Sequence, residues 1–297
     1  MVAPPLTITE EECNDLIEWL DATLRDFADA AQAHMAEGNW SMPRKVAIVT
    51  GASSGIGAAI AVAMAKSGCN VVATYGSNPE GGKATAITCE AQDVEAIAIN
   101  ADISSDEDCR SVVKAALEKW GRVDILINNA GTTRFADASD LDAINADDFE
   151  RIFAVNVAGC YQMTRAAAPH LKESQGNVVN ISSHSGFSGI GSSIAYAASK
   201  GALNTLTLSL ARSLAPNVRV NAVCPGFVDT DWMASNLDVE ALIAFKEKTV
   251  AITPLKRIPS AEDVAEATLW FALSQVPATG QLLVVDSGTH LTIGDPL

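Results

Sequence analysis

The sequence has few basic side chains. Its 20 lysines and arginines stand against 36 aspartates and glutamates, which gives a formal net charge of −16. Proteins that bind nucleic acids present a basic surface to the phosphates, and anionic membranes attract basic segments. The charge balance therefore argues against nucleic acid and membrane partners.

Long apolar runs are also missing. No stretch of about 18 apolar residues occurs, so we expect no membrane-spanning helix. The N-terminal residues are acidic, which predicts no signal or transit peptide. The six cysteines are widely spaced without a Cys-x-x-Cys pair, and we expect no metal site. Several lie in apolar segments, as is typical of buried free thiols in a reducing compartment, so we expect a cytoplasmic protein.

Apolar residues are plentiful, at 48% of 297 residues, and suit one large α/β core or two small ones. Residues 1–43 predict a separate helical extension. Thr9 to Glu12 form a capping-box pattern, and apolar residues then recur at helical spacing from Cys13 to Met35. Gly38 ends this predicted helix. Its apolar stripe fits packing on its own subunit or, alternatively, on a neighbouring one.

Residues 44–297 are expected to form a single domain. A β-branched run at 45–50, the glycine-rich segment Gly51 to Gly57 and an alanine-rich helix predict the first βαβ unit of a parallel sheet. Glycines there permit a tight turn and a close approach of a dinucleotide to the backbone. The helix N-terminus offers free amides and a positive dipole end to a pyrophosphate. A glycine triplet alone is a weak signal, but between a strand and a helix it predicts cofactor binding.

The end of the second predicted strand determines the choice of cofactor. An acidic residue there binds the ribose 2′-hydroxyl of NAD and repels the 2′-phosphate of NADP. Tyr75 holds this place and Gly76 and Ser77 follow, so NADP(H) is favoured. NAD(H) is the alternative, because no lysine or arginine stands nearby to bind a phosphate.

Two further strand ends carry residues that suit a cofactor site. Asp102 and Ile103 follow the predicted strand Ala96–Asn100, where they either flank an adenine or cap the next helix. Asn129, Ala130 and Gly131 follow another buried strand and either form a wall beside a cofactor ribose or make a simple turn. The sequence leaves both alternatives open.

Tyr196 and Lys200 are four residues apart and therefore share one face of a helix. A nearby positive charge favours phenolate and lowers a tyrosine pKa from about 10 toward neutrality. Ser183 ends the buried strand Val178–Ile181, at the edge where an open α/β sheet places ligands. The two hydroxyls are thus expected to meet across a bound carbonyl, although such Tyr/Lys pairs are also common among surface neighbours.

Asn156 lies within an apolar helical segment predicted over Ala146–Leu171. A buried amide needs hydrogen-bond partners. Asn156 is therefore either a satisfied core side chain or part of a proton relay.

Residues 44–290 resemble the classical short-chain dehydrogenase/reductase family. The motifs that carry the resemblance are Thr50 to Gly57, Asn128-Asn129-Ala130-Gly131, Asn156, Ser183, Tyr196 with Lys200, and Cys224-Pro225-Gly226 followed by Thr230. Their joint occurrence in this order and spacing is highly specific. The resemblance implies a doubly wound parallel sheet of about seven strands, with the N-terminal helix as an addition to the common pattern.

The resemblance also implies roles for the four catalytic candidates. Tyr196 is the general acid and base, and Lys200 holds the nicotinamide ribose and lowers the tyrosine pKa. Ser183 hydrogen-bonds the substrate oxygen, and Asn156 holds a water that links Lys200 to solvent.

Together, the residue patterns and the resemblance assign cofactor contacts to Gly51, Ser53, Ser54, Gly55, Ile56, Gly57, Tyr75, Ser77, Asp102, Ile103, Asn129, Ala130, Gly131, Tyr196, Lys200, Pro225, Gly226, Val228 and Thr230. The expected substrate side consists of His184, Phe187, Phe227 and Trp232, which suit a core equally well. The helix predicted over Leu237–Lys248 is expected to close over the substrate.

The implied activity is an NAD(P)(H)-dependent interconversion of a carbonyl and a secondary alcohol by hydride transfer. An acidic carrier protein prefers a basic rim, so the acidic chain favours a small free substrate. The alternatives are a 3-oxoacyl-thioester reductase and a non-enzymatic dinucleotide-sensing protein. By resemblance to the family, we expect a homodimer or homotetramer.

Overall fold

The computed structural model describes residues 17–26, 43–230, 232 and 238–292. The chain divides into two compact units, Met1–Arg44 and Lys45–Leu297, and each is described by itself. In the first unit, residues 17–26 are helical and exposed. The start and end expected for this helix, at Thr9 and Gly38, lie outside the described residues. Within the described residues, no helix is long and apolar enough to cross a membrane.

Seven parallel strands form the sheet of the second unit, in the order β3-β2-β1-β4-β5-β6-β7. The strands are β1 (Val46–Val49), β2 (Asn70–Tyr75), β3 (Ala96–Asn100), β4 (Ile125–Asn128), β5 (Asn177–Ile181), β6 (Arg219–Pro225) and β7 (Leu282–Val285). The central strands are aliphatic runs that are buried on both faces, as parallel sheets require. The predicted doubly wound parallel sheet is confirmed.

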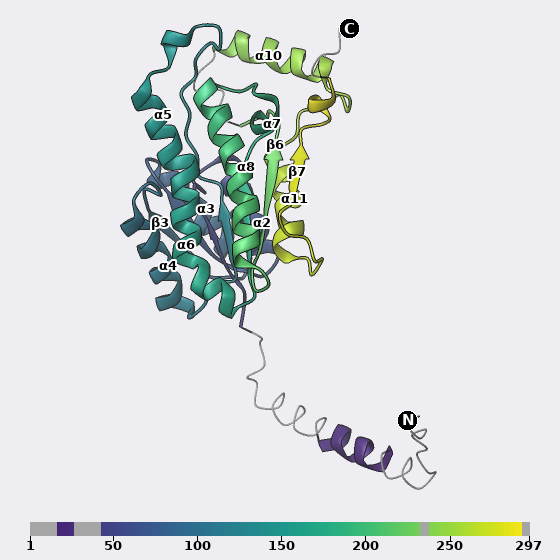
Figure 1. Cartoon of the computed structure of the whole chain (residues 1–297). Helices are drawn as coiled ribbons and strands as arrows, with labels where there is room; N and C mark the ends of the chain where they lie inside the picture. Colours follow the sequence, from purple (N-terminus) through teal and green to yellow (C-terminus); the bar gives the residue numbers. More distant parts are fainter. Residues whose placement is uncertain (1–16, 27–42, 231, 233–237, 293–297) are drawn as a thin grey trace, which may run out of the picture. The chain divides into compact units, whose positions relative to one another are not determined.

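Helices cover both faces of the sheet (Figure 1). One core lies under α2, α3 and α11 and contains Ile60 and Phe271, and the other lies under α4, α6 and α8 and contains Met163 and Leu210. The helices are α2 (Gly55–Lys66), α3 (Pro79–Glu90), α4 (Asp106–Trp120), α5 (Ala146–Phe153), α6 (Cys160–Glu173), α7 (Ser185–Ser188), α8 (Ile194–Leu214), α10 (Val239–Ile252) and α11 (Ala261–Leu273), with the short segments η1 (Leu141–Ala143), η2 (Ala154–Gly159) and η3 (Thr289–Leu291).

The strand order reverses at β1, which pairs with β2 on one side and β4 on the other. At such a reversal the loops that leave the carboxyl ends of the strands diverge and open a crevice. The loops after β1 and β4 therefore meet at this edge of the sheet. Helix α10 crosses the same end, toward which the arrows of β6 and β7 point (Figure 1).

The helix expected over Ala146–Leu171 is not a regular α-helix throughout. Its middle, η2, is π-helical and contains Asn156. The Asn156 side chain bonds both backbone polar groups of Thr132, in the loop after β4, and the hydroxyl of Ser199 on α8. Widened turns of this kind recur at functional sites. The partners lie 24 and 43 residues away in sequence, so the local pattern carried no sign of the distortion.

Candidate active site

The glycine-rich loop after β1 packs closely against the loop after β4. Gly51 has a φ of +63°, and a Cβ there would lie 2.8 Å from the Cα of Ala130. A Cβ on Gly57 would overlap the carbonyl oxygen of Gly51 and the side-chain amide of Asn129. Both positions therefore require glycine, one for its backbone conformation and both for space.

Hydrogen bonds hold the two loops in register. Nδ2 of Asn129 donates to the carbonyls of Thr50 (2.9 Å) and Gly51 (3.0 Å). The Thr50 hydroxyl accepts from the backbone N–H groups of Asn129 and Ala130, each at 3.0 Å. The Nδ2 group of Asn129 thus connects the two loops, and both of its hydrogens are committed to protein carbonyls.

The N-terminus of α2 lies at this cradle without a side-chain cap. Ser54, the N-cap residue, has an extended backbone, and its hydroxyl makes no capping bond. The first-turn N–H groups and the positive end of the helix dipole are therefore available to an anion. This set of backbone donors, with glycines that admit a close approach, fits the pyrophosphate of a dinucleotide.

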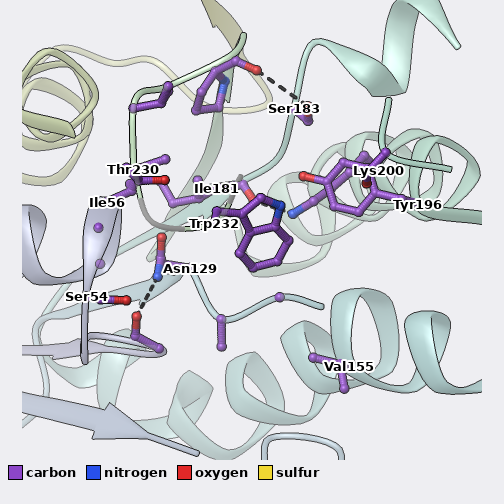
Figure 2. A pocket seen from close by; sticks show the side chains of 18 of the residues that line it. Ser54, Ile56, Asn129, Val155, Ile181, Ser183, Tyr196, Lys200, Thr230 and Trp232 are labelled. Atoms are coloured by element: carbon purple, nitrogen blue, oxygen red, sulfur yellow. Dashed lines mark hydrogen bonds between the residues drawn. The ribbon is translucent and has the colours of Figure 1, made fainter. Parts of the chain in front are cut away.

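A cavity of about 1390 Å³ runs from this cradle to α8 and α10. Most of the predicted site residues line it together: Gly51, Ser53, Ser54, Gly55, Ile56, Gly57, Ser77, Asp102, Ile103, Asn129, Ala130, Gly131, Ser183, His184, Tyr196, Lys200, Pro225, Gly226, Phe227, Val228, Thr230 and Trp232. Figure 2 labels some of the lining residues, among them Ser54 and Ile56 from the glycine-rich segment and Tyr196 and Lys200 from α8.

Three predicted site residues do not line this cavity. Tyr75 packs its ring against Gly82 of α3. Phe187 lies on α7 with 54% of its surface exposed to solvent. Asn156 is fully buried behind Gly131. Its side chain contacts Thr132 of the loop after β4 and Ser199 of α8, and its expected role in holding a water stays a prediction.

Lys200 is buried, with 4% of its surface exposed, and its ammonium donates a 2.8 Å hydrogen bond to the carbonyl of Ile181 at the end of β5. The same ammonium lies 5.6 Å from the centre of the Tyr196 ring. The helical spacing thus brings cation and phenol together, and the Ile181 carbonyl keeps the ammonium at the cavity rather than in solvent.

Ser183 is fixed at the carboxyl end of β5. Its Oγ accepts from the backbone N–H of Ser185 at 3.1 Å and lies 3.1 Å from the Ser185 hydroxyl. A weaker bond of 3.4 Å connects it to the carbonyl of Pro225, drawn as a dashed line in Figure 2. The oxygen is therefore held in place, while the hydroxyl hydrogen can turn between acceptors.

His184 lies beside Ser183 as a largely buried imidazole. Burial lowers the pKa of His184; the carboxylate of Asp286, 4.0 Å from Nδ1, opposes this and His290 adds to it. The buried Asp286 accepts from backbone N–H groups of Gly288 (2.9 Å) and His290 (2.7 Å). The His184 ring is therefore expected to be neutral near pH 7, and it brings no positive charge to the cavity.

Two aromatic lining residues from segments far apart in the chain were missed by the sequence patterns. Phe135 follows β4 and Phe245 lies on α10, and both line the cavity. The expectation that a helix near Leu237–Lys248 closes over the substrate pointed to α10, but no local signal identified which of its faces turns inward. Leu237 itself lies outside the described residues.

Asn156 offers a direct test of its supporting contacts. Replacing it by alanine leaves the N–H and C=O of Thr132 without their partner, while the Ser199 hydroxyl keeps its 2.7 Å bond to the Tyr196 carbonyl. Each unsatisfied buried group costs about 1–3 kcal/mol. We expect Asn156→Ala to lower the free energy of unfolding by at least about 1–3 kcal/mol in denaturant titrations. Asn217→Ala, in an exposed turn, is the control and should change it by less than about 0.5 kcal/mol. Equal effects would contradict a supporting role.

Comparisons with known proteins agree with this arrangement. Residues 45–240 match a family model described as short chain dehydrogenase. The chain is 44% identical over 247 residues to a Streptomyces violaceoruber protein named as a ketoacyl reductase of the granaticin polyketide synthase, and the match covers 83% of this chain and 96% of that protein. It is 34% identical to a 3-oxoacyl-[acyl-carrier-protein] reductase of Synechocystis, and the match covers 84% of this chain and 98% of that protein.

Solved structures are similar over the same extent. A short-chain dehydrogenase/reductase from Burkholderia xenovorans superposes with a TM-score of 0.78 at 40% identity, covering 84% of this chain and all of that one. A 3-ketoacyl-(acyl-carrier-protein) reductase from Brucella melitensis, complexed with NADH, superposes with a TM-score of 0.75 at 33% identity. The match covers 84% of this chain and 99% of that one. The chain therefore belongs to the short-chain dehydrogenase/reductase family of oxidoreductases, whose members bind NAD(H) or NADP(H).

Proposed function

We propose that this protein uses NADP(H) to interconvert a carbonyl and a secondary alcohol on a small free molecule, with Tyr196 as the general acid and base. The observation that carries the proposal is the meeting of three groups in one cavity with the glycine cradle: the Tyr196 phenol, the Lys200 ammonium and the Ser183 hydroxyl. They come from the end of β5 and from α8.

Tyr196 and Ser183 would both act on the oxygen of the substrate carbonyl. When bound, the reduced nicotinamide supplies a hydride to the carbonyl carbon. Tyr196 donates its phenolic proton to the oxygen as negative charge develops there, and Ser183 hydrogen-bonds the same oxygen. A positioned acid contributes roughly 10²–10⁴ in rate, and a donor aimed at a developing oxyanion roughly 10²–10³. Lys200 stabilises the phenolate that remains. Alcohol oxidation follows the reverse path.

The test is a panel of free ketones, aldehydes and secondary alcohols, assayed with both cofactors by the absorbance of reduced nicotinamide. We expect turnover of at least one free carbonyl compound. Tight dinucleotide binding without any turnover would instead support the sensing protein.

A second candidate is reduction of 3-oxoacyl thioesters, because relatives from Synechocystis and Brucella melitensis carry that name. The charge of the chain argues against a carrier-bound substrate. An acidic carrier protein would be repelled by a protein with a net charge of −16. If a carrier-bound thioester reacted far faster than its small free analogues, the free-substrate proposal would be overturned.

The preference for NADP(H) is supported by the residues after β2. None of Gly76, Ser77 and Asn78, which follow this strand and line the cavity, carries a carboxylate that would repel a 2′-phosphate. The Asn78 side chain caps α3 through the N–H of Gly81 at 2.9 Å. Among the described lining residues near this end, none is a lysine or arginine, so we expect a modest preference.

This account predicts that Ser54→Arg strengthens the preference. Arginine binds phosphate through charge-assisted hydrogen bonds worth about 1.5–3 kcal/mol, so the KM for NADPH should fall about tenfold. Ser54 makes no capping bond that the change would remove. Steady-state kinetics with both cofactors measure the effect, and the KM for NADH should not fall.

Ser67→Arg is the matched control for Ser54→Arg, because it adds the same charge at the exposed end of α2. A similar fall in the KM for NADPH in both variants would show a general charge effect and contradict a phosphate site at Ser54.

Exposed apolar side chains support the expectation of a homodimer or homotetramer. Large ones lie on outer helices, including Ile194 and Leu208 of α8 and Trp270 of α11.

The described cysteines are buried and unpaired, and burial raises their thiol pKa values to about 11–12. They are Cys69, Cys89, Cys109, Cys160 and Cys224. Inert thiols of this kind are compatible with the cytoplasm that we propose as the location.

A further inference from the structure

Aromatic side chains gather at the end of the cavity formed by α10 and by the loops after β4 and β6. Phe135, Phe227, Trp232 and Phe245 all line it. Aromatic residues make up only 5% of the sequence, so these four, with Tyr196 as a fifth in the same cavity, are a marked concentration. Figure 2 shows the Trp232 indole in the same cavity as Tyr196 and Lys200.

Two of these rings form a wall with a defined orientation. Phe227 and Phe245 meet edge to face, with ring centres 4.9 Å apart and planes at 89°. Beside this pair, the ammonium of Lys246 lies 2.7 Å from a carboxylate oxygen of Asp229. Two adjacent residues of α10 thus contact the loop after β6. Rings held at fixed angles favour further offset or edge-to-face contacts with another π system.

The cavity offers little to an anionic substrate. Among the described residues that line it, Lys200 is the only lysine or arginine, and its ammonium already contacts the Ile181 carbonyl. Of the aspartates that line the cavity, Asp102 and Asp108 lie after β3 on the cofactor side, and Asp137 follows Phe135 on the aromatic side. Burying a charge without a partner is costly, so this composition favours a neutral molecule.

We propose that the substrate is a neutral ketone or aldehyde that carries an aromatic ring no more than one methylene from the reacting carbonyl, and that Phe227 and Phe245 determine this specificity. The inference rests on the proposed carbonyl reduction at Tyr196. It goes beyond that function by naming the chemical class of molecule that the cavity selects.

The experiment compares β-tetralone with β-decalone, a ketone of nearly the same size and shape that lacks the aromatic ring. We expect kcat/KM to be about tenfold higher for β-tetralone, since each aromatic contact adds a few-fold beyond the area that it buries. Calorimetric titration of both ketones into the protein with oxidised cofactor gives a readout independent of turnover and should show the same order of affinity.

Matched variants assign the preference to the wall. Phe245→Leu keeps an apolar side chain but removes the ring, and the ratio between the two ketones should fall to about threefold or less. Phe149→Leu is the control, because Phe149 also belongs to an aromatic pair, with Phe153 on α5, and has a similar exposure of 37% against 38%. Its ratio should stay at the wild-type value.

The outcomes separate this inference from the proposed function. Reduction of both ketones with β-decalone equal or preferred would overturn the aromatic specificity and leave carbonyl reduction standing. Acetoacetyl-coenzyme A turning over faster than β-tetralone would overturn the neutral-substrate inference as well. Preferential binding of β-tetralone without turnover of any carbonyl would support the aromatic site and contradict the proposed reaction.

Discussion

Tyr196→Phe is expected to reduce the rate of carbonyl reduction by about 10²–10⁴-fold, the contribution of a positioned general acid. The change removes only the phenolic hydroxyl. The ring keeps its place, since its packing against Gly191 and its position below the Lys200 ammonium do not involve the oxygen. The loss should therefore appear in the chemical step, which single-turnover oxidation of bound NADPH measures directly.

Cofactor binding and protein stability should be much less affected by Tyr196→Phe than the rate. The dissociation constant for NADPH is expected to change far less than the rate, because Tyr196 is one of many expected cofactor contacts. The free energy of unfolding should stay within about 0.5 kcal/mol of wild type. Tyr161→Phe, an exposed tyrosine on α6, is the matched control and should retain full activity. Turnover within tenfold of wild type in Tyr196→Phe would remove the tyrosine from the proposed mechanism.

Elements with strong local patterns were predicted closely from the sequence. Residues Ala96–Asn100 occur as β3 with the bounds that the sequence indicated, and Asp106–Trp120 form α4, whose two ends carry clear local signals. The edge strand β3 alternates alanine and isoleucine and is partly buried. Helix α4 has a serine cap, an acidic first turn and a glycine just after its end. The glycine-rich segment was predicted equally well, because its position between a strand and a helix favours a tight turn beside a cofactor.

Side-chain direction at a strand end was less well predicted. Thr74 lines the cavity, and its hydroxyl accepts from the N–H of Gly51 at 3.3 Å. Successive side chains of a strand point to opposite faces, so Tyr75 turns away and packs on α3 at Gly82. The alternation was present in the sequence, yet which of the two residues faces the ligand depended on how the loop after β1 folds.

The aromatic end of the cavity had no local signature. Phe135 and Phe245 are 110 positions apart in the chain and come together only because α10 crosses the carboxyl ends of the strands. The same reasoning applies to Asn156, whose partners lie in the loop after β4 and on α8. These contacts depend on the tertiary structure and not on a local residue pattern.

Gly57→Ala is expected to have the second large effect, because a methyl group there has no room. It would overlap the Gly51 carbonyl oxygen and the Asn129 amide, which are themselves joined by a 3.0 Å hydrogen bond. Overpacking of this kind costs about 1–3 kcal/mol. Moving the loop to relieve it shifts the backbone donors that the cofactor needs. We therefore expect the NADPH dissociation constant to rise at least about tenfold and the free energy of unfolding to fall by about 1–3 kcal/mol.

Gly201→Ala on α8 is the matched control for Gly57→Ala. Its Cβ would meet only the Gly186 carbonyl oxygen, at an ordinary 3.5 Å, and alanine within a helix gains about 0.5–1 kcal/mol over glycine. The control should therefore unfold at equal or higher denaturant concentration and bind NADPH normally by calorimetric titration. If Gly57→Ala matched it in both measurements, the close approach of the loops would not be what shapes the cofactor cradle.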